Sequence, residues 1–195
     1  PPEMIITKNT DDSAENWNCW HTGLSGNEYR IILNQSSAED GTSPTVWNSN
    51  INPTSTTFSL GSAAAANGSS NAIIAYCFHS VAGYSKIGSY TGNSSTTGPI
   101  VYTTDDGTSG GSNGFKPRFI MVKGVTANYS SHWMMMDSAR DTDTVKDKRL
   151  LANLSNVETD DSNWAVEFLD NGFQPKSTFS GFNNSAGTYI YMAFK

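Results

Sequence analysis

The sequence predicts an all-β fold, an antiparallel β-sandwich built from two duplicated halves. The first observation is composition: charged residues make up 15% of the 195 residues and apolar residues 36%. Gly, Ser, Thr and Asn fill much of the rest, as is typical of short strands joined by turns. The second observation is a series of β-branched and aromatic runs that occurs twice in the same order. We therefore expect a single domain over 1–195, with halves 1–78 and 116–195 and an insert at 79–115.

The duplication rests on landmarks that keep their order in both halves. PEMIITK (2–8) matches PRFIMVK (117–123), Trp17 matches Trp133, RIILNQS (30–36) matches RLLANLS (149–155), and SSNAIIAYCF (69–78) matches SAGTYIYMAF (185–194). A repeat of this length indicates two copies of one supersecondary unit that share a core.

Each landmark also predicts an element. Short apolar runs after a proline, and apolar runs closed by turn clusters, indicate strands. We expect strands over 4–8, 17–21, 56–61 and 72–78, and over 119–123, 133–137, 177–182 and 188–194. Period-two alternation should turn Phe58 and Phe179 inward. Residues 141–154 are the one stretch compatible with a helix. The insert should hold a strand or hairpin at 83–93 and a flexible loop at 107–114.

Charge and hydropathy exclude two classes of partner. The net charge is −6, and no basic run is present, which argues against a nucleic-acid surface. The longest apolar run, around Ala63–Ala66, is far too short to span a membrane. Two cysteines suit a protein made in a reducing cytoplasm and do not form a disulfide scaffold.

The two cysteines each precede a histidine by two positions, as Cys19-x-His21 and Cys77-x-His79. Two such pairs could form a zinc cage, although this spacing is unusual for zinc sites. A Cys/His nucleophile is less favoured, because no oxyanion-hole motif accompanies it. A Cys19–Cys77 disulfide stays open if their strands are neighbours.

The repeat favours a plainer interpretation of both cysteines. Cys19 aligns with Met135 and Cys77 aligns with Ala193. Unpaired cysteine often behaves as a small buried hydrophobe. We therefore expect two core cysteines with histidines at the strand ends, and no metal site.

Paired aspartates in turn clusters are the next candidates. Asp105 and Asp106 are weak candidates for binding Ca²⁺, which takes six to eight oxygen ligands. Aspartate is common in turns for backbone reasons, and this is the favoured interpretation. Such carboxylate pairs could also serve a glycosidase, but so acidic a chain offers them by chance.

Aromatic residues beside Asn, Asp, Ser or Gly are the better functional lead. Sugar-binding sandwiches stack pyranose rings on such side chains. The expected glycan-stacking set is Trp20, Tyr84, Tyr90 and Tyr102, and within the insert we expect Tyr84 and Tyr90 to be the exposed pair. The alternative is that the tryptophans are core anchors.

Taken together, PEMIITK, IAYCFHSVAGYSKIGSYTGN, GFKPRFIMVK, KRLLANLSN and TYIYMAF form a series that resembles a known domain. That domain has no known function and occurs in predicted tail-fibre and other structural proteins of marine phages, including viruses of cyanobacteria and Pelagibacter-like hosts. The resemblance covers essentially the whole chain, and residues 83–93 are its most specific piece. It implies a concanavalin-like (laminin-G-like) jelly roll and supplies no catalytic residues.

We accordingly expect a non-enzymatic virion protein without a cofactor, made in the host cytoplasm and located on a tail fibre, spike or capsid surface. Its role would be assembly and lectin-like attachment to host surface glycans. The expected partners are other copies of itself, for which a trimer is one option, other virion proteins, and host polysaccharide. The alternatives are a polysaccharide-degrading enzyme on a concanavalin-like fold and a self-assembling filament or decoration subunit.

Overall fold

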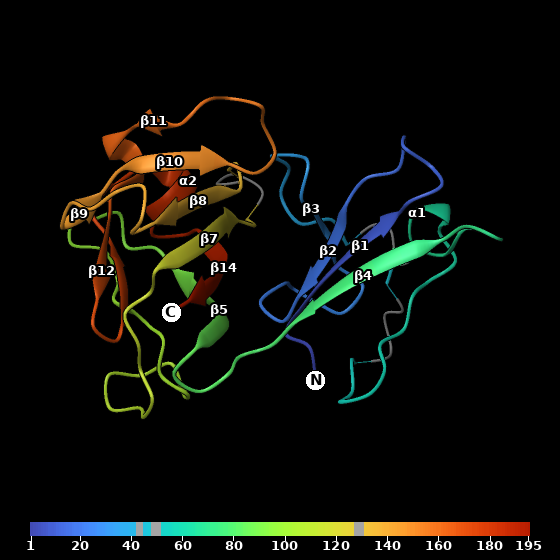
Figure 1. The fold of residues 1–195 in the computed structure, drawn as a ribbon, viewed down its shortest axis with the longest axis horizontal. Coiled ribbons are helices and arrows are strands. Elements are labelled where there is room, and N and C mark those ends of the chain that lie inside the picture. The colour runs from blue at the N-terminus through green and yellow to red at the C-terminus, as the bar shows by residue number, and fades with distance from the viewer. Residues whose placement is uncertain (42–44, 48–51, 127–130) are drawn as a thin grey trace.

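The computed structural model describes residues 1–41, 45–47, 52–126 and 131–195. Within them the chain forms three antiparallel sheets, so the predicted all-β sandwich is confirmed (Figure 1). The first sheet contains, in spatial order, β3 (Ile31–Ile32), β2 (Asn18–His21), β1 (Met4–Asn9) and β4 (Ile73–Phe78). The second contains β11 (Thr159–Asp160), β10 (Lys148–Leu151), β8 (Met134–Asp137), β7 (Phe119–Gly124), β14 (Thr188–Phe194) and β5 (Ser85–Thr91). The third contains β6 (Val101–Tyr102), β13 (Gly172–Pro175), β12 (Val166–Leu169) and β9 (Val145–Lys146).

The first two sheets share an order and a register. The order β3-β2-β1-β4 corresponds, strand for strand in chain order, to β10-β8-β7-β14 within the second sheet. Ile6 lies opposite Cys19 in the first sheet, and Met121 lies opposite Met135 in the second. The sequence repeat aligns Ile6 with Met121 and Cys19 with Met135, so equivalent residues pair in both sheets.

Hydrogen bonds outside the ladders repeat as well. The backbone N–H of Trp17 donates to Oδ1 of Asn34 at 3.1 Å, and that of Trp133 donates to Oδ1 of Asn153 at 3.0 Å. Arg30 donates from Nε and Nη2 to Oδ2 of Asp40, and Arg149 makes the same two bonds to Asp161. The repeat therefore extends to side chains that hold the loops.

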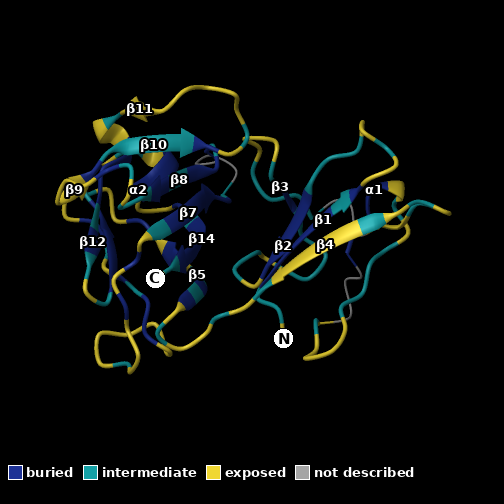
Figure 2. Ribbon diagram, viewed as in Figure 1, coloured by how far each residue is buried: buried dark blue, intermediate teal, exposed yellow. Residues whose placement is uncertain are grey.

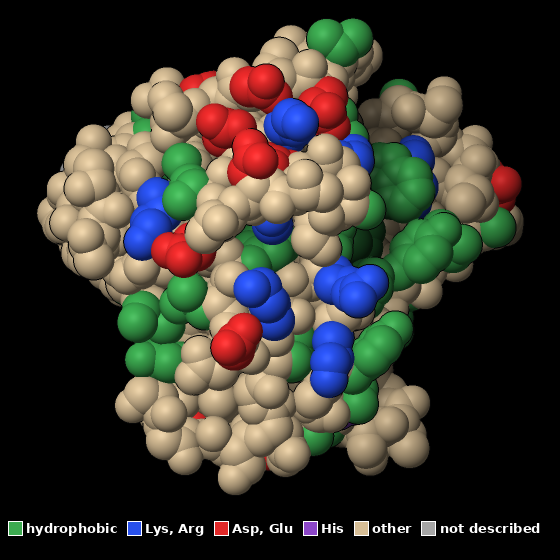
Figure 3. All heavy atoms as spheres, turned by 60° about the vertical axis from the view of Figure 1, so that its left-hand side comes forward, with side chains coloured by type: hydrophobic (Ala, Val, Ile, Leu, Met, Phe, Trp, Pro, Cys, Tyr) green, Lys and Arg blue, Asp and Glu red, His purple; other side chains and the backbone are tan. Residues whose placement is uncertain are grey.

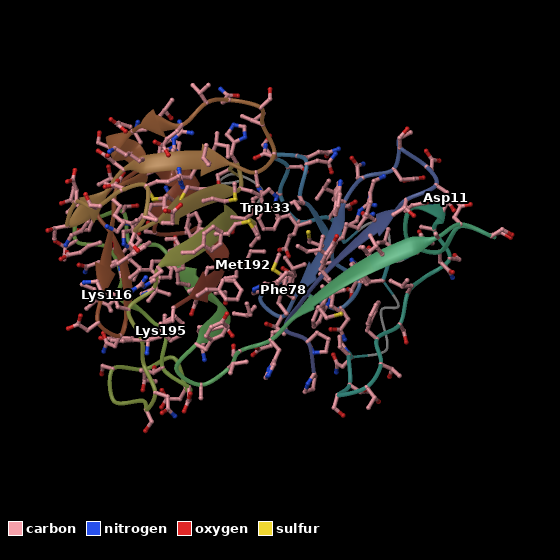
Figure 4. All side chains as sticks on the ribbon, in the orientation of Figure 1. Asp11, Phe78, Lys116, Trp133, Met192 and Lys195 are labelled. Atoms are coloured by element: carbon pink, nitrogen blue, oxygen red, sulfur yellow. The ribbon has the colours of Figure 1, made fainter. Side chains whose placement is uncertain are left out.

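The first and second sheets pack against each other through equivalent faces. Ile6 and Cys19 from the first sheet share one apolar cluster with Met121 and Met135 from the second. Trp133 and Met192 lie in this seam, with Phe78 at its edge (Figure 4). Because each sheet presents the same alternate residues, the seam resembles an interface between two copies of one protein.

The opposite faces of these two sheets are also covered in similar ways. In the first half, Ile5 and Trp20 pack with Trp47 beside the short helix α1 (Ala64–Asn67). In the second, Ile120 and Met136 pack with Trp164, from the 3₁₀ turn η2 (Ser162–Trp164), beside α2 (Ser180–Asn183). The third sheet completes this second cluster. No helix in the described residues is long and apolar enough to cross a membrane.

Three element predictions are wrong. The stretch 141–154 forms β9 and β10 instead of a helix, because Leu150 and Leu151 pair with β8, and tertiary pairing overrides weak helix propensity. Residues 56–61 form no strand beyond one bridge at Leu60, and 177–182 lead into α2. Their phenylalanines Phe58 and Phe179 nevertheless pack, partly buried, against the two outer clusters.

Candidate functional site

The two cysteines lie on opposite faces of the first sheet. Cys19 on β2 is opposite Ile6, whereas Cys77 on β4 is opposite Ile5, and both strands flank β1. Both thiols are free, so the disulfide left open by the sequence does not form. Full burial raises the pKa of the Cys19 thiol and partial desolvation raises that of Cys77, so the protonated form of each is dominant at neutral pH.

The core prediction is correct for Cys19 and wrong for Cys77. Cys19 is fully buried between the sheets, whereas Cys77 is exposed. The difference arises because β4 is an edge strand, while its counterpart β14, which carries Ala193 at the aligned position, is covered on both sides.

The two histidines are separated in the same way. His21 is buried, and its Nδ1 accepts a hydrogen bond from the N–H of Gly23 at 2.8 Å. Its Nε2 lies 3.4 Å from the carbonyl oxygen of Tyr191, and burial lowers its pKa to about 4. His79 is exposed. Across the described part of the chain, no three His, Cys, Asp or Glu side chains are grouped to hold a metal ion.

The four aromatic candidates do not form a sugar-stacking platform. Trp20 is buried against the outer cluster of the first sheet. Tyr90 is also buried, stacked on Tyr189 at 5.1 Å, and its hydroxyl donates to the carbonyl of Phe182. The expectation that Tyr90 is exposed is therefore wrong: the alternation of β5 turns this ring inward. Tyr102 is half-buried.

Only Tyr84 of that set is largely exposed, at 58%. It lies in the turn before β5, with its ring 6.4 Å from that of Phe194. A single exposed tyrosine can contribute one stacking surface, and the other three candidates do not join it.

The two aspartates stabilise the turn that contains them. Oδ1 of Asp106 accepts hydrogen bonds from both the N–H and the hydroxyl of Thr108. These bonds lower the pKa of Asp106. Oδ2 of Asp105 accepts from the side-chain amide of Asn113 at 2.7 Å. The carboxylate oxygens of Asp105 and Asp106 thus accept hydrogen bonds from their own turn, as is usual for aspartates in turns.

The surface that stands out is the outer edge of β4, where described residues pair with β1 alone. The strand reads IIAYCF and contains neither a charge nor a proline. Ile74 and Tyr76 are 39% and 44% exposed. Figure 2 shows β4 mostly exposed beside buried β1 and β2. Edge strands of soluble proteins usually carry charged residues, proline or a bulge, which prevent pairing with another chain. β4 contains no charged residue and no proline.

The hydrogen-bonding groups on this edge can be assigned from the ladder. The carbonyl of Ala72 accepts from the N–H of Thr10 on the β1 side. Because alternate residues of an antiparallel strand bond to the same neighbour, Ile73, Ala75 and Cys77 direct their N–H and C=O groups outward. The edge therefore offers three amide groups to another strand.

The second half covers the corresponding edge. β5 pairs with β14 along its whole length, from Thr91 opposite Thr188 to Ser85 opposite Phe194. β5 comes from the insert, which occurs once in the chain. The sequence predicted a strand over 72–78 but did not reveal its exposure. The exposure of β4 could have been inferred from the insert. The insert occurs once, so its strand can cover only one of the two equivalent sheet edges.

The molecule is thus an antiparallel β-sandwich protein whose first half ends in an open apolar edge. A family model matches it over residues 1–195, and the chain belongs to this family, described as Domain of unknown function (DUF7483). No curated protein and no solved structure matches the chain.

Proposed function

We propose that the chain is a non-enzymatic structural module of a virion that assembles with other copies of itself through β4. The open edge of β4 is the observation that carries this proposal. The partner strand would take the place along β4 that β5 takes along β14, running antiparallel and bonding to the outward amides of Ile73, Ala75 and Cys77.

A second copy of β4 suits that place. Two identical strands can pair antiparallel about a twofold axis, which satisfies both edges at once and leaves none open. Such pairing would join two first sheets into one continuous sheet and bury Ile74 and Tyr76 of both copies. Burying apolar side chains that are about 40% exposed adds to the backbone bonds.

The virion setting is supported by the resemblance of the chain's segments to phage tail-fibre and structural-protein domains. Attachment to host surface glycans is the less supported part of the proposal, since Tyr84 is the one largely exposed member of the expected aromatic set. A glycan array probed with the assembled protein tests attachment separately, and absence of binding would remove that part while leaving the assembly role.

Sedimentation velocity from micromolar to millimolar concentration tests the assembly role. We expect the wild type to form dimers or larger closed assemblies as concentration rises. Tyr76→Lys places a charge on the pairing strand and should weaken association at least tenfold. Val157→Lys is the matched control, because Val157 is 81% exposed on the loop between β10 and β11. It should leave association unchanged.

Two results would contradict the proposal. One is a wild type that stays monomeric over the whole concentration range. The other is equal weakening by Tyr76→Lys and Val157→Lys, which would mean that general surface hydrophobicity, and not β4, drives association.

A further inference from the structure

A second feature, away from β4, lies at one end of the second sheet. A cavity of about 710 Å³ opens there between the ends of β7 and β14 and the third-sheet strands β9 and β12. Its volume is within the range of small-molecule sites. Four cationic side chains line it: Lys116, Arg118, Lys146 and Lys195. We call it the basic cavity.

The basic cavity is unusual in a chain of net charge −6. Its two lining carboxylates are Asp143 and Glu167, and Oε2 of Glu167 is already paired with Lys176 at 2.9 Å. In the view of Figure 3, Lys and Arg side chains lie across the middle of the molecular surface, below a group of acidic residues. Four of the chain's 12 Lys and Arg residues thus line one cavity.

The four cationic side chains differ in their hydrogen bonds and ion pairs. Lys146 donates to the carbonyls of Asp141 and Asp143 at 2.9 and 2.7 Å and lies over the ring of Phe168, so it forms part of the wall. Among the described residues, the ion pair of Lys116 is with the fully exposed carboxylate of Asp170, at 3.9 Å. Exposed contacts of that length contribute little.

Arg118 and Lys195 have no ion pair within the described ranges of the chain. The N–H of Arg118 donates to the carbonyl of Phe194 at 2.7 Å. The β7–β14 ladder ends at the pair Phe119–Phe194, so Arg118 and Lys195 each lie one residue beyond it, at the same end of the two strands. Two cations without an ion pair therefore lie at one strand end, where like charges repel each other.

The first half has no such conflict at the aligned positions. Glu3 and His79 occupy these positions, each one residue beyond the last β1–β4 pair, Met4 opposite Phe78, and they are not two cations of the Arg and Lys kind. The cation pair is therefore a property of the second half alone. Figure 4 shows Lys195 and Lys116 at the same end of the second sheet.

We propose that the basic cavity binds a tetrahedral oxyanion, a phosphate or sulfate group, between Arg118 and Lys195. The planar guanidinium can donate two parallel N–H bonds to two oxygens of such a group, and the ammonium supplies a third donor. The hydroxyls of Ser138, Thr142 and Thr144 also line the cavity and can donate to the remaining oxygens. The bound anion would remove the repulsion between the two cations.

The group could be a free ion or a substituent of a sugar, and the cavity is large enough for either. The probes are inorganic phosphate, inorganic sulfate, glucose 6-phosphate and glucose 6-sulfate, with glucose as the uncharged control. Each is titrated into the ¹⁵N-labelled protein at low ionic strength, where charge interactions are least screened. Backbone amide shifts at Ser138 and Lys195 and the Nε–H signal of Arg118 report binding.

We expect saturable shifts with the anions and none with glucose. Tighter binding of the sugar esters than of the free ions would identify a substituted saccharide as the source, and equal binding would identify the ion alone. Arg118→Gln and Lys195→Gln should each weaken binding by about tenfold. Lys148→Gln makes the same change in net charge outside the cavity and should alter binding less than twofold.

Non-saturating shifts with every anion would overturn the proposal, because they indicate only general attraction to a positive surface. Equal weakening by Lys148→Gln and Arg118→Gln would overturn it as well. Arg118 and Lys195 are both exposed, so their variants should fold, and far-ultraviolet circular dichroism checks this. The outcome is independent of assembly through β4.

Discussion

The indole Nε1 of Trp133 donates to the carbonyl oxygen of Ile32 at 2.9 Å, and this bond joins the two halves of the molecule. Trp133 immediately precedes β8 in the second half, whereas Ile32 is the last residue of β3 in the first half. Lys123 makes a second link, since its buried ammonium donates to the carbonyls of Ser36 and Ser37. The seam between the sheets is therefore polar at defined points as well as apolar.

Trp133→Phe should lower the free energy of unfolding by about 2–3 kcal/mol, because it removes this hydrogen bond and leaves a gap at a fully buried position. Urea unfolding followed by circular dichroism measures the change. Trp17→Phe, at the aligned position of the first half, is the control. Trp17 is only half-buried, so its loss should be smaller, and equal losses would contradict the assigned role of Trp133.

Thiol chemistry should distinguish the two cysteines. Only Cys77 is exposed, so the folded protein should react with one equivalent of a thiol reagent such as dithionitrobenzoate at pH 8, and with two after unfolding. Cys77→Ser should change stability by less than about 0.5 kcal/mol. Cys19→Met should cost about 1–3 kcal/mol, since the larger side chain enters a packed seam. No reaction in the native state would indicate a disulfide or a covered β4.

Stability should fall with acidity because of His21. Its folded pKa is lowered to about 4, whereas an unfolded histidine titrates near 6.5. Between these values the unfolded chain binds a proton that the folded chain does not, so the free energy of unfolding decreases as pH falls from 6.5 to 4. The full effect is about 3 kcal/mol.

Urea unfolding at pH 7, 6, 5 and 4 measures this slope. His21→Leu should flatten it, whereas His79→Gln, which changes an exposed histidine, should leave it intact. A slope that persists unchanged in His21→Leu would assign the pH dependence to other groups.

The fold was predictable from the sequence because its signals are local and occur twice. Alternation and apolar runs identified β1, β7, β4 and β14, and the repeat aligned Cys19 with Met135 in the register that the sheets adopt. The helix predicted over 141–154 failed because strand pairing with β8 decides that segment, and no local pattern records such a pairing.

The sites were less predictable, because exposure depends on neighbours distant in sequence. IIAYCF and TYIYMAF both read as buried strands, and only the position of β5 makes one an edge and the other a centre. Likewise, the alternation of β5 predicts the burial of Tyr90 only if one knows which face of β5 packs against the third sheet. The placement of Arg118 and Lys195 at one strand end could have been found from the aligned strands, because each residue lies one position beyond them.

Amide hydrogen exchange of β4 tests the central claim, pairing between copies through this edge, most directly. Exchange is measured by NMR or mass spectrometry in dilute and concentrated protein. We predict that the outward amides of Ile73, Ala75 and Cys77 exchange at least tenfold more slowly in the concentrated sample, because pairing protects them. The amides of Ile74 and Tyr76, already bonded to β1, should change less. Outward amides that exchange equally fast at both concentrations in a protein shown to be assembled would contradict the claim.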